Sequence, residues 1–176
     1  MTIDLRGRVG IVTGAGAGIG RELALTFGSE GVRTVALDVD QERLESLGRE
    51  FVRAGYDGMQ LACDVTDPEQ VRAAVARVEA EYDRVDILVN NAGVAVGGPV
   101  ETLPVERWDL NFDVNARGTF LMSQAVVPVM KRQRSGRIIN AASFAAIVPS
   151  LGSAAYASSK AAVVYFTRVL AGELGP

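Results

Sequence analysis

The sequence predicts a single-domain, three-layer α/β fold, in which helices cover both faces of a doubly wound parallel sheet. Short β-branched runs alternate with longer segments whose apolar residues recur at helical spacing. The first of these runs is apolar without alternation, as expected for a strand buried on both faces. The 176 residues contain no internal repeat and no low-complexity linker. We therefore expect one domain over residues 1–176.

Five strands are expected, and each is followed by a helical segment. The expected strands are residues 8–13, 34–37, 59–62, 87–89 and 137–140. Apolar residues at helical spacing mark the first three helices: Ile19, Leu23 and Phe27, then Leu44, Leu47 and Phe51, then Val71, Ala74, Val75 and Val78. Asp67 is expected to cap the third helix, with Pro68 at its first position and Gln70 completing a capping box. A fourth helical region covers residues 104–133 in two pieces, and the last helix covers residues 152–169.

Composition excludes several classes of function. The net charge of −3 argues against a nucleic-acid partner. No run of 18 apolar residues is present, so no membrane span is expected. Cys63 is the single cysteine and histidine is absent, which excludes a disulfide framework, a Cys/His zinc site and a His-based triad. We expect no metal site, and this cysteine usage favours a cytoplasmic location.

A glycine-rich turn follows the first expected strand. Residues 13–20 read TGAGAGIG and lie between that strand and a helix. Glycine permits positive φ and removes the Cβ that would block a phosphate, and the following helix offers free N–H groups. In this context the turn is typical of a Rossmann-type dinucleotide site, although three glycines can also form an ordinary tight turn. The expected contacts to the cofactor come from Gly14, Gly16, Gly18, Ile19 and Gly20.

An acidic residue, Asp38, follows the second strand. Its carboxylate can accept both hydroxyls of the adenosine ribose and would repel the extra phosphate of NADP. NADP-binding sites usually need a nearby Arg or Lys, but the turn holds Ala15 and Ala17, and Asp38 is followed by Val39 and Asp40. Arg33 precedes the strand and is expected at its other end. Asp38 could instead cap a helix, a role that Asp40 could also fill. The pattern favours NAD.

Further motifs follow in a fixed order. They are Thr13, Gly14, Gly18 and Gly20 in the turn, Asp64 with Val65, the NNAG stretch from Asn90 to Gly93, Asn115, Ser143, and the YxxxK pair of Tyr156 and Lys160. Together they resemble the short-chain dehydrogenase/reductase family over nearly the whole chain. The resemblance implies that Asp64 and Val65 lie near the adenine, and that Asn91, Ala92 and Gly93 pass the adenosine ribose. It also implies that Asn115, Ser143, Tyr156 and Lys160 are catalytic.

The chemistry of these four residues suits hydride transfer, which requires a proton to move on or off the substrate oxygen. Tyr156 can transfer that proton, and Lys160, one helical turn away, is a cation that stabilises the tyrosinate. Lys160 is also one of only two lysines among 18 basic residues. The resemblance implies that Lys160 bonds the nicotinamide ribose and that Asn115 holds a water. Ser143 can hold the substrate oxygen. Structural roles are the alternatives: a core tyrosine, a strand-end serine and a buried, satisfied asparagine.

The sequence ends at Pro176, whereas family members usually continue with two more strands and a substrate-binding segment. We therefore expect the C-terminal strands to be missing, with the fifth strand left as an exposed edge. The leading hypothesis is an NAD-dependent oxidoreductase that interconverts a secondary alcohol and a ketone. One alternative is an NADP-dependent carbonyl or 3-oxoacyl-thioester reductase, and another is a truncated, non-catalytic nucleotide-binding fragment. The resemblance also implies a homodimer or homotetramer assembled through residues 104–133 and 152–169.

Overall fold

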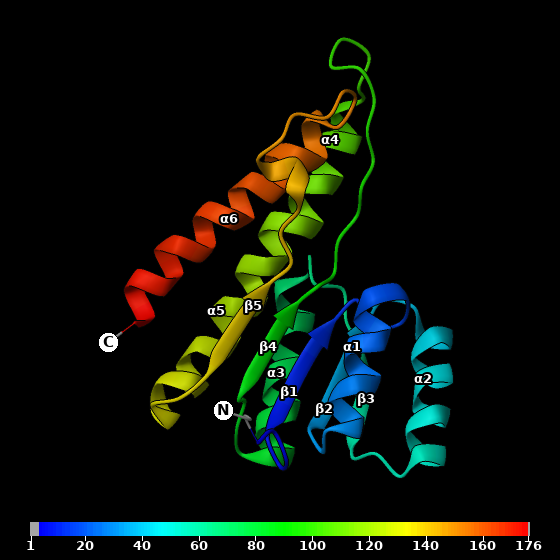
Figure 1. Cartoon of the computed structure of the whole chain (residues 1–176), viewed down its shortest axis with the longest axis vertical. Coiled ribbons are helices and arrows are strands. Elements are labelled where there is room, and N and C mark those ends of the chain that lie inside the picture. Colours follow the sequence, from blue (N-terminus) through cyan, green and yellow to red (C-terminus); the bar gives the residue numbers. More distant parts are fainter. Residues whose placement is uncertain (1–3, 176) are drawn as a thin grey trace.

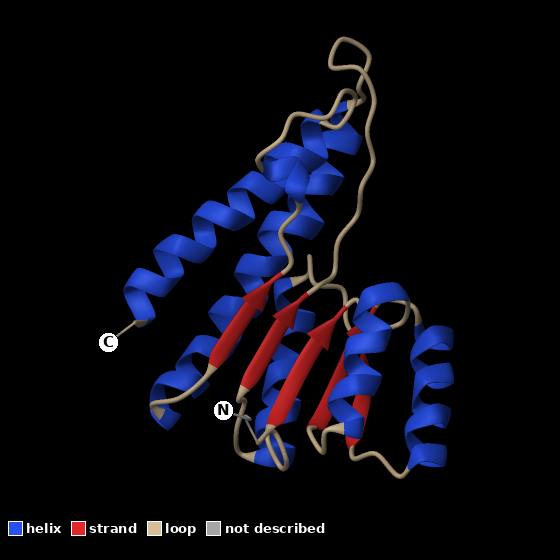
Figure 2. Ribbon diagram, in the orientation of Figure 1, coloured by secondary structure: helices blue, strands red, loops and turns tan. Residues whose placement is uncertain are grey.

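The computed structural model describes residues 4–175 and contains one parallel sheet of five strands in the order β3-β2-β1-β4-β5 (Figures 1 and 2). The strands are β1 (Val9–Thr13), β2 (Arg33–Asp38), β3 (Gly58–Ala62), β4 (Ile87–Asn90) and β5 (Arg137–Asn140). Each differs from the expected strand by no more than one residue at either end. The order reverses between β1 and β4, so the sheet is doubly wound and the predicted fold class is confirmed.

Helices cover both faces of this sheet. They are α1 (Gly18–Ser29), α2 (Gln41–Ala54), α3 (Pro68–Tyr82), α4 (Val105–Asn111), α5 (Gly118–Gln133) and α6 (Ala154–Leu174). Alternate strand residues face opposite layers. Ile11 packs in the core formed with α3 and α5, whereas its neighbour Val12 packs in the core formed with α1 and α2. The last helix, α6, packs beside β5 (Figure 1).

Local signals explain where these helices begin and end. Asp40 caps α2 by accepting the N–H of Arg43, and Asp67 caps α3 by accepting the N–H groups of Glu69 and Gln70. Gly55 ends α2 in the left-handed conformation with φ of +68°. The cap by Asp67 is confirmed, but Gln70 does not complete the predicted capping box, because its Oε1 accepts the N–H of Asp64 and the N–H of Asp67 donates to Asp64 O. Of the two carboxylates considered as a cap near α2, Asp40 has that role.

The helical region expected at residues 104–133 contains two α-helical pieces, as expected, but they are continuous with each other. A π-helical turn, Phe112–Arg117, joins α4 to α5. The backbone stays right-handed helical at both junctions, Phe112 and Gly118, so no break occurs. A π-helical turn inserts an extra residue without ending a helix, so the chain stays helical from α4 to α5.

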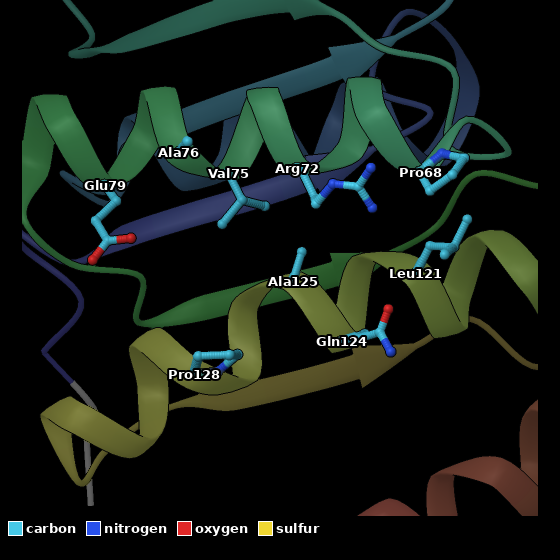
Figure 3. Close-up of a pocket in the computed structure, with 9 residues that line it drawn as sticks. All are labelled: Pro68, Arg72, Val75, Ala76, Glu79, Leu121, Gln124, Ala125 and Pro128. Carbon is cyan, nitrogen blue, oxygen red and sulfur yellow. The ribbon is translucent and has the colours of Figure 1, made fainter.

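Side chains also line a hollow of about 300 Å3 between α3 and α5 (Figure 3). Val75 and Ala76 of α3 face Ala125 and Pro128 of α5 across it. None of the predicted site residues lines this hollow. Among the described residues, no helix is both long enough and apolar enough to cross a membrane.

Candidate functional site

The predicted site residues gather where the five parallel strands end. Because the carboxyl ends of parallel strands lie at one edge of a sheet, the turns after them meet there (Figure 2). The glycine-rich turn follows β1, and Asp38 ends β2. Asp64 comes two residues after β3, and Ser143 comes three residues after β5. This edge, at the point where the strand order reverses, is where open α/β sheets bind ligands.

The glycine-rich turn is packed against the segment that follows β4. Thr13 Oγ1 accepts hydrogen bonds of 3.0 Å from the N–H groups of both Asn91 and Ala92. The Asn91 amide donates in return to the carbonyls of Thr13 and Gly14. Gly14 has φ of +63°, and a Cβ on it would lie 2.8 Å from Ala92 Cα. A Cβ on Gly20 would lie 2.1 Å from Gly14 O, so no larger residue fits at these positions.

The start of α1 is suited to an anion. Its N-cap residue, Ala17, makes no side-chain cap, whereas Asp40 and Asp67 cap α2 and α3. The N–H groups of the first turn of α1 therefore receive no side-chain acceptor at the cap, and the positive end of the helix dipole lies beside them. Gly18 has φ of +54° and open space around it, and Ile19 is exposed there. These features fit the pyrophosphate of a dinucleotide.

Asp38 is held in place by two backbone donors. Its Oδ2 accepts the N–H of Gly16 at 2.8 Å, and its Oδ1 accepts the N–H of Asp40 at 3.0 Å. Each oxygen keeps a further lone pair, so the fixed carboxylate can accept two ribose hydroxyls. Arg33 lies at the first residue of β2, where it pairs with Asp57, and therefore at the opposite end of the strand.

Two residues that follow β3, Asp64 and Val65, can contact a ligand in different ways. Asp64 Oδ1 accepts hydrogen bonds of 2.8 Å from both the N–H and the hydroxyl of Thr66, while Oδ2 takes part in neither bond. The side chain of Val65 is buried, and a Cβ on Gly118 would lie 2.7 Å from its Cγ2. Asp64 can therefore reach a ligand through its side chain, whereas Val65 can do so only through its backbone.

Asn115 is fully buried in the π-helical turn. Its Oδ1 accepts the N–H of Val94 at 2.8 Å, and its Nδ2 donates to Val94 O and to Ser159 Oγ, each at 2.9 Å. The amide thereby clamps the segment after β4 to α6. The adjacent Gly93 is tightly enclosed, because a Cβ there would lie 3.1 Å from Asn115 Oδ1 and 3.4 Å from Lys160 Nζ.

Lys160 is 5% exposed, and its ammonium group points toward the end of β5. The Nζ donates a hydrogen bond of 2.7 Å to Ala141 O, two residues before Ser143. Burial lowers the pKa of Lys160 from its usual value. Asn115, Gly93 and Lys160 thus come together from three segments that are far apart in the sequence.

Ser143 and Tyr156 lie on either side of the connection from β5 to α6. Ser143 caps the short 3-10 helix Phe144–Ala146 by accepting the N–H of Ala145, and this helix packs against α6. Tyr156 lies in the first turn of α6 and is half-buried. Its carbonyl accepts the hydroxyl of Ser159. The connection from β5 to α6 thus carries Ser143 at its start, and α6 carries both Tyr156 and Lys160.

The sequence analysis missed several polar residues around this cluster. Ser159 links Asn115 to the backbone of Tyr156. Asn90 and Asn140 are paired in register at the ends of β4 and β5, and Asn90 Nδ2 donates to Asn140 Oδ1 at 2.8 Å. An asparagine ending each of two neighbouring strands was a usable signal for this pair. Arg43, which lies beside Gly16, was also missed.

Comparison with known proteins identifies relatives over almost the whole chain. The family model described as short chain dehydrogenase matches residues 8–176. A D-threitol dehydrogenase from Mycolicibacterium smegmatis is 43% identical over 173 residues, covering 97% of this chain and 66% of the relative. The 3-oxoacyl-[acyl-carrier-protein] reductase FabG of Thermotoga maritima is 39% identical over 170 residues, covering 97% of this chain and 69% of the relative. The chain thus spans about two thirds of the length of these curated relatives.

Solved structures show the same fold. An NAD+-bound xylitol dehydrogenase superimposes with a TM-score of 0.95 at 34% identity, over 99% of this chain and 67% of that protein. A metagenomic short-chain oxidoreductase in complex with NADP superimposes with a TM-score of 0.93 at 38% identity, over 98% of this chain and 78% of that protein. Similar structures therefore include both NAD and NADP complexes.

Proposed function

Because the chain belongs to the short-chain dehydrogenase/reductase family of oxidoreductases, we propose that it is an NAD-dependent enzyme that interconverts a secondary alcohol and a ketone. The observation that carries the proposal is the meeting of Lys160, Asn115 and Gly93 beyond the ends of β4 and β5, the sheet edge at which the glycine-rich turn also lies. A bound nicotinamide dinucleotide would supply the hydride acceptor or donor.

The geometry of the turn supports the proposed contacts to the cofactor. The uncapped start of α1, with Gly14, Gly16, Gly18, Ile19 and Gly20, would bind the pyrophosphate. The carboxylate of Asp38 would accept the adenosine ribose hydroxyls, and its negative charge disfavours a phosphate at that position.

The remaining cofactor residues line the sheet edge on either side of this turn. Asp64 and the backbone of Val65 would contact the adenine. The backbone of Asn91, Ala92 and Gly93 would pass the ribose. The side chain of Asn91 would not contact the ribose, because its amide already donates to the carbonyls of Thr13 and Gly14. A Cβ at residue 93 would crowd Asn115 Oδ1 at 3.1 Å, so glycine keeps the backbone there free of a side chain.

Four side chains would carry the reaction. Tyr156 would move the proton on or off the substrate oxygen, while Ser143 would donate a hydrogen bond to that oxygen. The buried cation of Lys160 would stabilise the tyrosinate and bond the nicotinamide ribose. Asn115 would position the segment from Gly93 to Val94 beneath the cofactor and hold a water near Lys160.

Replacing Tyr156 tests this proposal. Tyr156→Phe is expected to abolish NADH formation from a panel of secondary alcohols and polyols, while NAD+ binding measured by calorimetry changes little. Tyr165→Phe is the matched control, because Tyr165 lies on the same helix and is exposed. Turnover that persists in Tyr156→Phe, or that is lost equally in both variants, would contradict the assignment.

A second candidate is an NADP-dependent carbonyl or 3-oxoacyl-thioester reductase. It is favoured by the similarity to FabG and to the NADP complex, and by Arg43 lying against Gly16. Competition between NAD+ and NADP+ for the wild-type chain separates the two candidates. Tighter binding of NADP+ would replace the leading proposal with this one.

We also expect the protein to assemble as a homodimer or homotetramer through α5 and α6. Phe120 of α5 and Phe166 of α6 make an edge-to-face ring contact, with 6.2 Å between centroids, and Phe120 and Tyr165 expose much of their surface. An exposed aromatic surface of this kind favours association. Light scattering that shows only the monomer mass would contradict this expectation.

A further inference from the structure

Helix α6 carries Tyr156 and Lys160, and two hydrogen bonds tie this helix to the end of β5. Asn140 Nδ2 donates to Thr167 Oγ1 at 2.9 Å, and Lys160 Nζ donates to Ala141 O at 2.7 Å. Within residues 4–175, no other hydrogen bond joins α6 to β5 or to Ala141. Lys160 and Thr167 lie about two helical turns apart and therefore on one face of α6. These two bonds are the polar contacts that fix α6 against the end of the strand.

The bond made by Asn140 is independent of the proposed chemistry. In the proposed function the Lys160 ammonium also bonds the nicotinamide ribose, so its N–H donors are shared between Ala141 O and the ligand. The Asn140 amide contacts neither substrate nor cofactor in that proposal. It can therefore hold α6 in place whatever Lys160 binds.

The Asn140 amide satisfies its neighbours in one orientation only. Its Oδ1 accepts Asn90 Nδ2 at 2.8 Å, and its Nδ2 donates to Thr167 Oγ1. The Thr167 hydroxyl donates to Val163 O at 2.7 Å, so toward Asn140 it acts as an acceptor. A flipped amide would set two donors against each other at Asn90 and two acceptors against each other at Thr167. The side chain is therefore a fixed link between β4, β5 and α6.

Ala141, the acceptor of Lys160, is held by the same neighbour as Asn140. Asn90 O accepts the N–H of Ala141 at 2.9 Å. The Asn90 side chain is 3% exposed, and its Nδ2 donates to Asn140 Oδ1 and to Ser123 Oγ of α5. A buried amide with these partners cannot shift without leaving some of them unpaired, which is costly away from water. The Asn140 amide and the acceptor of Lys160 therefore form one rigid unit.

We propose that Asn140 is a positioning residue for Lys160, whose amide holds α6 at Thr167 and so sets the height at which the Lys160 ammonium meets the end of β5. This inference rests on the proposed function, in which Lys160 stabilises the tyrosinate of Tyr156 and bonds the cofactor. Asn140 touches no reacting atom and acts through α6. Without its amide, Lys160 would meet Ala141 O less often and water would reach the ammonium.

Lysine NMR reads this positioning without any need for activity. Lys131 and Lys160 are the two lysines of the chain, so protein labelled with carbon-13 at lysine Cε gives two signals to follow with pH. Burial lowers the pKa of Lys160, and no carboxylate among the described residues contributes to this shift. Water that enters would solvate the ammonium, so the Lys160 titration should move to higher pH in Asn140→Ala. The signal of the exposed Lys131 is the internal reference and should be the same in every variant.

A second variant tests the link to the helix, and a third controls for stability. Thr167→Val removes the acceptor of Asn140 Nδ2 at nearly constant volume, so it should move the Lys160 titration in the same direction as Asn140→Ala. Gln133→Ala is the matched control, because its amide bonds both the N–H and the carbonyl of Val85 at the opposite end of the sheet. It should lower the urea midpoint by a similar amount but leave the Lys160 titration unchanged.

Turnover supplies a second readout once a substrate alcohol is found. Asn140→Ala should lower the turnover rate by about tenfold, because a displaced ammonium stabilises the tyrosinate less. Gln133→Ala should change that rate less than about twofold, since it lies far from the candidate catalytic residues along the sheet.

The outcomes separate the inference from the function on which it rests. An unchanged Lys160 titration in Asn140→Ala and Thr167→Val would overturn the inference, even if both variants lose stability. An equal change in Gln133→Ala would overturn it as well, because the effect would then be a general loosening of the fold. Circular dichroism checks folding, and if Asn140→Ala does not fold, Thr167→Val decides by itself. A wild-type chain that binds no NAD+ refutes the proposed function, whereas the lysine titration still decides whether Asn140 positions Lys160.

Discussion

Removing the Asn115 amide should destabilise the fold more than removing any single hydroxyl beside it. Asn115→Ala deletes three hydrogen bonds: two to the backbone of Val94 and one to Ser159 Oγ. Asn115 is fully buried, so water does not readily replace these partners. At about 1 kcal/mol for each bond, the expected loss in the free energy of unfolding is about 3 kcal/mol. For a chain of this size the midpoint of thermal unfolding should fall by about 6–12 °C.

The assay is urea unfolding followed by far-UV circular dichroism and by the fluorescence of Trp108, which stacks on Phe112 at the start of the π-helical turn. Ser159→Ala is the matched control, because it removes one of the three bonds to Asn115, together with the bond from Ser159 Oγ to Tyr156 O. It should cost about 2 kcal/mol. The double variant should be less destabilised than the sum of the single variants, because both remove the same bond. An Asn115→Ala variant no less stable than Ser159→Ala would refute the clamp between the β4 segment and α6.

Three further predictions concern the turn, the opposite end of the sheet and the cysteine. Gly20→Ala forces a Cβ against Gly14 O and should lower the free energy of unfolding measured in urea by about 2 kcal/mol. The control Gly172→Ala lies in open space on α6 and should raise it by up to about 1 kcal/mol, so equal effects of the two variants would contradict the close approach at Gly20. Burial would raise the pKa of Asp86, but hydrogen bonds from Arg84, the N–H of Val9 and Arg8 outweigh this and lower it. Its stabilising contribution should therefore be complete above the unfolded pKa of about 3.9 and be lost as pH falls through the native pKa, so that Asp86→Asn flattens the acid limb of the stability profile. Burial and the nearby carboxylates of Asp64 and Asp67 raise the pKa of Cys63 to about 11. At neutral pH the native thiol should therefore resist a disulfide reagent that modifies the urea-unfolded chain, and rapid reaction of the native protein would refute the burial of Cys63.

Much of the fold was predictable because its signals are local. Strand β1 is a continuous apolar run, and Asp67, Pro68 and Gln70 mark the start of α3 within four residues. The π-helical turn was not predictable in this way, since an inserted residue leaves the apolar pattern on either side intact. Asn115 lies in this turn and bonds Val94, which is 21 residues earlier in the chain.

The candidate site likewise combines local motifs, which the sequence predicts, with contacts between distant segments, which it does not. The spacing of Tyr156 and Lys160 and the glycines of residues 13–20 could be read directly, because each motif lies within a few residues. Arg43 forms no such motif, because it lies five residues after Asp38 in the sequence. In the structure Asp40 begins α2, and the first helical turn brings Arg43 back toward Gly16.

The sequence by itself determined the succession of strands and helices, the turn that only glycine can form and the chemical types of the candidate residues. These depend on backbone preferences and side-chain chemistry within short segments. Only the tertiary structure decided which groups meet: Lys160 with Ala141 O, Asn115 with Val94 and Ser159, and Arg43 with Gly16. Such contacts arise when the sheet and its helices pack, and packing joins residues whose separation along the chain no local pattern encodes.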